Sequence, residues 1–143
     1  MDQIALVKEQ IEGGEKLVRK LLERGFDVRA AFWGKTESDG RPYLYLVAPQ
    51  VDVPGVSAGY GEVSAAQAEL ERDGTHWMEQ IDPFGVNLLS PNHPLARGVL
   101  NLYRDNPKLK PSLPRDQRIG SEFVDNAFIY PPSLFQPVAT ATP

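Results

Sequence analysis

The segment Gly55-Val56-Ser57-Ala58-Gly59 matches the pattern G-x-S-x-G, in which a serine can act as a nucleophile. That chemistry needs a sharp strand-to-helix turn that exposes the serine, and a histidine, oriented by a carboxylate, that removes its proton. Asp82 and His93 follow in the order nucleophile, acid, base. However, only Val51-Asp52-Val53 and Pro54 precede the motif, which is too little for a buried parallel strand. We therefore interpret Ser57 as a helix-start residue, and a serine hydrolase as the third-ranked hypothesis.

The two histidines, His76 and His93, could bind a metal only if other ligands converged with them. Glu79 and Asp82 follow His76, but the H-x-x-x-H and H-E-x-x-H spacings are absent and the chain has no cysteine. The glycine patterns that bind nucleotide phosphates are absent as well. We predict no metal site, no cofactor and no catalytic residue, and we expect His93 to cap the helix that follows it.

Aromatic residues supply the candidate binding site, which consists of Trp33, Tyr43, Tyr45 and Tyr60 together with His76. Tyrosine and tryptophan are common in interfaces and pockets because they combine a large ring with a polar group. They are also ordinary residues of a sheet face. Core packing is therefore the favoured interpretation. If these residues form an interface, we expect Trp33, Tyr43 and Tyr45 to share a less covered sheet face that serves as that interface. The alternative is a pocket between sheet and helices, near Trp33, Tyr45, Tyr60 and His76.

Residues 104–118 form the most basic part of the chain, with five cationic and two acidic side chains. Such a segment could contact phosphates or an acidic partner. Aromatic residues that could stack on bases are not interleaved with these cations. The chain as a whole has a net charge of −4, which disfavours non-specific binding to nucleic acid. We therefore interpret 104–118 as a solvated segment and do not expect nucleic acid as a partner.

The elements that position these residues follow from hydrophobic periodicity. Apolar residues recur at helical spacing over 2–24, which predicts an amphipathic helix. Gly13-Gly14 lies in its middle and could split the helix or let another backbone approach. Two β-prone runs, 28–35 and 43–48, flank a turn that contains Asp39-Gly40, which is typical of a hairpin.

The second half of the chain holds ten of the thirteen prolines, and shorter elements are expected there. Periodicity and breakers predict helices at 56–73 and 94–105, strands at 86–89 and 123–130, and a short strand or linker at 77–81. The residues 107–120 contain three prolines and no clear periodicity, and we interpret them as a surface loop.

The order αββ-α-β-α-β predicts an α+β domain over 1–135, with a mostly antiparallel sheet of about four strands and helices packed on one face. A flexible tail is expected at 136–143. No apolar run approaches the roughly 20 residues of a membrane span, and the N-terminus lacks the pattern of a secretory signal. We therefore expect a cytoplasmic protein with no membrane partner.

These observations favour a non-catalytic protein-interaction domain that associates with a protein partner or with itself. The run Tyr43–Val47 is apolar at both faces, which suggests a central strand or a strand at an interface. Self-association through a sheet face or edge is therefore expected. A domain that binds or senses a small molecule is the alternative hypothesis.

Overall fold

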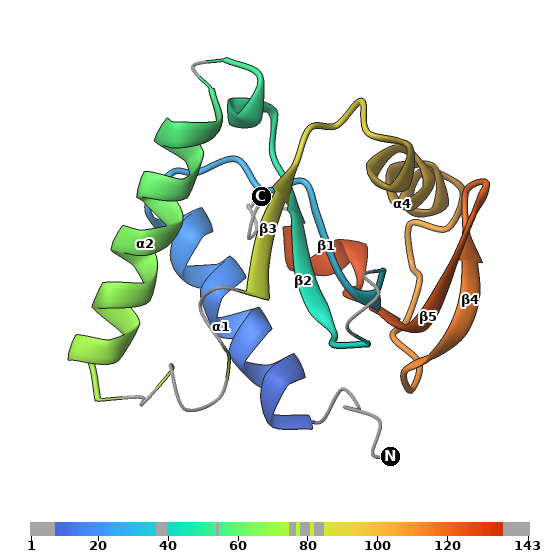
Figure 1. The fold of residues 1–143 in the computed structure, drawn as a ribbon, viewed down its shortest axis with the longest axis horizontal. Helices are drawn as coiled ribbons and strands as arrows, with labels where there is room; N and C mark the ends of the chain where they lie inside the picture. The colour runs from blue at the N-terminus through green and yellow to red at the C-terminus, as the bar shows by residue number, and fades with distance from the viewer. Residues whose placement is uncertain are drawn as a thin grey trace, which may run out of the picture.

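The computed structural model describes residues 8–36, 40–53, 55–74, 77, 81 and 85–135 (Figure 1). One five-stranded sheet forms its centre, with the strand order β3-β2-β1-β5-β4. The α+β class predicted from the sequence is confirmed. The elements, in chain order, are α1 (Lys8–Glu23), β1 (Ala30–Lys35), β2 (Tyr43–Val47), the 3-10 helix η1 (Pro49–Val51), α2 (Val56–Arg72), β3 (Val86–Leu89), α4 (Pro94–Asp105), β4 (Arg115–Ile119), β5 (Glu122–Ile129) and the 3-10 helix η3 (Pro132–Phe135).

The sheet is mostly antiparallel, as predicted. β1 pairs with β2 and with β5, and β5 pairs with β4, all antiparallel. β3 alone runs parallel to its neighbour β2, because α2 carries the chain from one to the other. This arrangement makes β2 an internal strand, which explains why its side chains are apolar on both faces.

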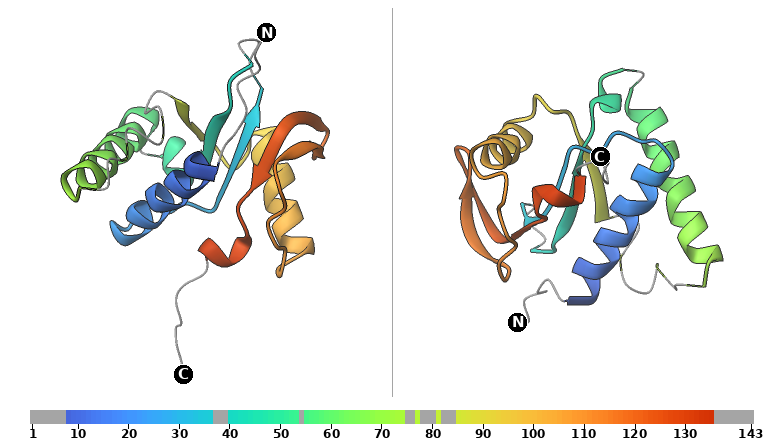
Figure 2. Two further views of the ribbon diagram at one scale, coloured as in Figure 1. Left: turned by 90° about the horizontal axis from the view of Figure 1, so that it is seen from below. Right: turned by 180° about the vertical axis from the view of Figure 1, so that it is seen from behind.

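Helices cover both faces of the sheet, where the sequence had suggested one. α1 and α2 pack on one face, and α4 packs on the other (Figures 1 and 2). The first core contains Leu17 and Leu21 of α1 together with Trp33 and Leu46 of the sheet. The second core contains Val99 of α4 together with Phe32 and Val47, which lie on the opposite face of the same strands.

A fifth strand, β4, lies within the segment 107–120 that was predicted to be a loop, so the sheet has five strands rather than about four. The sequence of β4 is Arg-Asp-Gln-Arg-Ile, and only Ile119 is buried. This polar sequence suits a strand at the edge of the sheet. It lacks the apolar residues at every second position by which strands are identified from sequence. Gly120, with φ +63°, begins the two-residue turn into β5.

The helix α1 runs through Gly13-Gly14 without a break, and the atoms nearest to an added Cβ at Gly14 belong to side chains. The Tyr130 hydroxyl donates to the Ile11 carbonyl at 2.6 Å and accepts the Trp33 Nε1–H at 3.0 Å. Trp77 Nε1–H donates to the Gly13 carbonyl at 2.9 Å. A Cβ at Gly14 would lie 2.2 Å from the Tyr130 oxygen, so only glycine leaves room for this contact.

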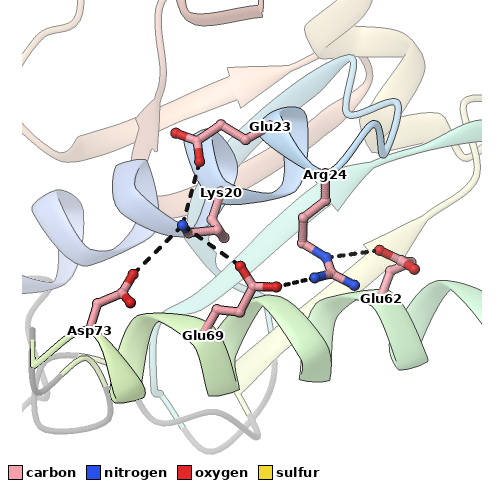
Figure 3. A network of polar contacts seen from close by, with 6 residues as sticks. All are labelled: Lys20, Glu23, Arg24, Glu62, Glu69 and Asp73. Carbon is pink, nitrogen blue, oxygen red and sulfur yellow. Dashed lines mark hydrogen bonds and ion pairs between the residues drawn. The ribbon is translucent and has the colours of Figure 1, made fainter.

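The helices α1 and α2 are joined along their exposed sides by a network of ion pairs (Figure 3). Lys20 lies 3.8 Å from Glu69 and 3.7 Å from Asp73, measured between charged atoms. Arg24 donates to Glu62 at 3.1 Å and also to Glu69. The hydrogen bond to Glu62 and the charges of Glu62 and Glu69 raise the pKa of Arg24. The network adds ion pairs to the apolar packing between α1 and α2 in the first core.

Some predicted elements lie outside the described residues: the helix start at 2–7, most of the segment 77–81, and the tail 136–143. None of the helices in the described part combines the length and apolar character needed to cross a bilayer.

Candidate binding sites at the two edges of the sheet

The predicted aromatic site is divided between the two faces of the sheet. Trp33 is 1% exposed and lies under α1 and α2. The strand register pairs Tyr45 with Phe32 and Tyr43 with Gly34, so both tyrosines lie on the face that α4 covers. Tyr45 stacks on Phe32 with ring centroids 5.2 Å apart. The expected common face of Trp33, Tyr43 and Tyr45 therefore does not exist, and His76 lies outside the described residues.

Tyr45 and Tyr60 do come together, in a groove of about 430 Å³ beside the edge strand β3. The groove exists because α4 packs mainly over β1, β5 and β4, on one half of the sheet face. The other half, at β2 and β3, is less covered. The residues that line the groove are Thr36, Tyr45, Tyr60, Asn87, Leu88, Leu89, His93 and Leu95.

The polar groups of this groove are arranged to donate hydrogen bonds. The Tyr60 hydroxyl accepts the Leu88 N–H at 2.9 Å, which leaves its own proton for another acceptor. His93 Nδ1 accepts the Leu95 N–H at 3.1 Å, so the neutral imidazole carries its proton on Nε2. The amide of Asn87 adds further donors. The lining includes no Asp, Glu, Lys or Arg in the described part of the chain.

Two further, smaller hollows are present besides the groove beside β3. Trp33 and Tyr43 border a cavity of about 40 Å³, which has room for roughly one water molecule. A wider hollow of about 330 Å³ lies between the end of α1 and the start of α2, beside Arg24 and Gln50. The buried Gln50 Oε1 has no hydrogen-bond partner there within the described structure.

The two edges of the sheet differ in how they are protected. At β3 the Leu88 N–H, which points away from β2, donates a hydrogen bond to the Tyr60 hydroxyl. At β4 no described strand pairs with the outer side (Figure 1). Arg115, Asp116 and Arg118 of β4 are exposed, and neither arginine has an ion-pair partner among the described residues. The open edge of the sheet is therefore β4.

The turn between β4 and β5 determines which amides of β4 point outward. A two-residue turn closes on a hydrogen-bonded pair, here Ile119 and Glu122. Because amide directions alternate along a strand, Gln117 also points toward β5, while Asp116 and Arg118 direct their N–H and C=O groups to the open side. Asp116 also uses Oδ1 to accept the Asn126 N–H at 2.8 Å.

Large apolar side chains are exposed near this edge. Leu113, two residues before β4, is 84% exposed, and Phe123, which pairs with Arg118, is 63% exposed. The sequence prediction missed β4 as a candidate site. The Gly120-Ser121 dipeptide, which is typical of a two-residue hairpin turn, could have indicated the strand.

Nucleophilic serine chemistry lacks its structural context here. Ser57 lies exposed in the first turn of α2, and the 3-10 helix η1, not a strand, precedes that turn. The mostly antiparallel sheet also differs from the parallel sheet in which a nucleophile elbow forms. His93 caps α4, as predicted. Within the described ranges, no three His, Asp or Glu side chains cluster as a metal site would require.

Comparisons of the chain with protein-family models, with curated protein sequences and with solved structures found no match.

Proposed function

We propose that the chain is a non-catalytic protein-interaction domain that self-associates through the open edge of β4. The observation that carries the proposal is the unpaired outer side of β4, where the amides of Asp116 and Arg118 point away from the sheet. Much of each sheet face, by contrast, is buried, by α1 and α2 on one side and by α4 on the other.

Unpaired strand edges readily accept another strand, because each added pairing satisfies backbone N–H and C=O groups. Charged side chains at an edge discourage indiscriminate pairing. Arg115, Asp116 and Arg118 therefore favour a partner strand whose charges match theirs. Five residues give a small interface, so we expect a weak and reversible association.

Sedimentation velocity over a wide range of protein concentration tests this proposal. We expect the weight-average mass to rise with concentration. Arg118→Pro should reduce this rise, because it removes an outward amide and leaves the pairing with β5 in place. Arg97→Ala, on the exposed side of α4, is the control that should behave as wild type. A monomer mass at every concentration would overturn the proposal.

The groove beside β3 supports a second candidate function, the binding of a small molecule. Its volume of about 430 Å³ lies within the usual range of ligand sites. Because Tyr60, Asn87 and His93 offer donors and no charged side chain lines the groove, the ligand we propose is uncharged, with acceptor oxygens and an apolar part.

A thermal-shift screen with uncharged amides, esters and polyols tests this second candidate. A saturable rise in melting temperature, lost in Asn87→Arg, is the expected result, because the long side chain would fill the groove. Asn101→Arg places the same side chain on the exposed side of α4 and should leave the rise intact. An Asn87→Arg variant that responds as wild type does would exclude the groove as the site.

A further inference from the structure

We infer that two copies of the chain pair antiparallel along β4, about a two-fold axis that passes midway between the Gln117 residues of the two copies. This inference rests on the proposed self-association and specifies its geometry. It follows from three properties of β4: the direction of its amides, the order of its charges, and the proline that precedes it.

The amide directions limit the possible registers. Strands pair antiparallel when outward-pointing residues of one lie opposite outward-pointing residues of the other. In β4 these are the even-numbered residues Asp116 and Arg118. A symmetric pair that obeys this condition can be centred on residue 116, 117 or 118. Every centre halfway between two residues is excluded, because it sets outward amides against inward ones.

The charges select one of these three registers. Centring on residue 118 places Arg118 opposite Arg118 of the second copy, which is repulsive. Centring on residue 116 places Asp116 opposite itself and Arg118 opposite Pro114, which has no amide to donate. Centring on Gln117 places Asp116 of each copy opposite Arg118 of the other. Two opposite-charge pairs then form, and both are hydrogen-bonded pairs of the ladder.

The surrounding structure agrees with this register. Arg118 is exposed and lacks an ion-pair partner among the described residues, and Asp116 uses one oxygen for the Asn126 amide, which leaves the other for the second copy. Pro114 and the Gly120 turn bound the strand on either side, so the ladder is short. The pairing would join the two sheets into one, with each copy's α4 on the same face.

A single introduced cysteine tests the register, because the chain contains no cysteine of its own. The axis places Gln117 opposite itself as a non-hydrogen-bonded pair, with Cα atoms about 4.5 Å apart, within the range that a disulfide spans. Gln117→Cys should therefore form a covalent dimer under mild oxidation. Arg115→Cys is the matched control in the same strand, and it should cross-link far less because residue 115 lies opposite residue 119.

Charge exchange provides a second, independent test by sedimentation velocity. In a dimer of Asp116→Arg, or in one of Arg118→Asp, residues 116 and 118 carry the same charge, so both cross-strand pairs are repulsive. Each substitution should therefore weaken association roughly tenfold. The double variant with both substitutions should regain wild-type association. An equimolar mixture of the two single variants should also associate, because each supplies the charge that the other lacks.

The outcomes separate this inference from the proposed function. If wild type associates but Gln117→Cys cross-links no better than Arg115→Cys and the double variant is not restored, the register is overturned and self-association stands. If wild type stays monomeric at all concentrations, both are overturned. Association that appears only with an acidic protein would also overturn the pairing of two copies.

Discussion

At the scale of single residues, Gly14 of α1 lies directly against the hydroxyl of Tyr130, the residue that follows β5. We predict that Gly14→Ala lowers the free energy of unfolding by roughly 1–3 kcal/mol, the usual cost of overpacking a core. The added methyl group must displace a hydroxyl that hydrogen-bonds to Trp33 and Ile11. Urea denaturation of the variant beside wild type would measure this loss.

Two further variants control the glycine prediction. Gly61 lies in α2 with nothing within 4 Å of an added Cβ, so Gly61→Ala should stabilise the protein by up to about 1 kcal/mol through helix propensity. Adding Tyr130→Phe to Gly14→Ala removes the clashing oxygen and should recover part of the loss. A Gly14→Ala variant as stable as wild type would show that α1 can move away from Tyr130 at little cost.

The buried tyrosines Tyr103 and Tyr130 give the stability a dependence on high pH. Burial raises the pKa of both side chains above the ordinary value of 10.0. The unfolded chain therefore loses these protons first, and stability that is fully present below pH 10 falls as the pH rises above it. We expect a decrease of about 1.4 kcal/mol per pH unit for each tyrosine. Urea midpoints between pH 9 and 11 should fall less steeply in Tyr103→Phe, and equal slopes would contradict the prediction.

At the scale of elements, the helices were predictable because each carries an apolar stripe on one side only. α2 and α4 begin and end within one residue of the predicted positions. The edge strand β4 was not predictable from periodicity, because its solvent-exposed side chains carry no apolar alternation.

The prediction that Trp33 and Tyr45 share a sheet face failed for a different reason. The alternation within β1 shows which of its own residues share a face. It does not show which face of β1 lies on the same side of the sheet as Tyr45 of β2, because that depends on the pairing register between the two strands.

Glu69 of α2 is the carboxylate that both Lys20 of α1 and Arg24, the residue that follows α1, contact. We predict that Glu69→Gln lowers the melting temperature modestly, and that the difference from wild type shrinks in high salt, where exposed charges are screened. Glu15→Gln is the control, since Glu15 pairs only with Arg19 of its own helix in the described structure. Equal effects of the two substitutions would show that the network adds nothing between the helices.

At the scale of the whole molecule, the candidate sites lie where the layers of the fold are incomplete. α4 covers only part of its sheet face, and the β3 groove is the remainder. The sheet also stops at β4 without a neighbour. The sequence indicated aromatic residues for binding and a basic segment for solvent. It could not indicate which parts stay uncovered, because coverage is set by where elements far apart in the chain come to lie.

Self-association through β4 should also appear in the thermal stability of the whole chain. A partner that binds only the folded state raises the melting temperature as protein concentration rises. We expect this dependence in wild type and its loss in Arg118→Asp, which replaces the attraction between Asp116 and Arg118 with repulsion. High salt should weaken the dependence without abolishing it, because the charge pairs are screened and the backbone hydrogen bonds of the ladder remain.

Calorimetry over a hundredfold range of concentration would measure the effect. Arg97→Asp is the control with the same charge change on α4, and a concentration dependence that persists in Arg118→Asp would place the contact elsewhere on the molecule.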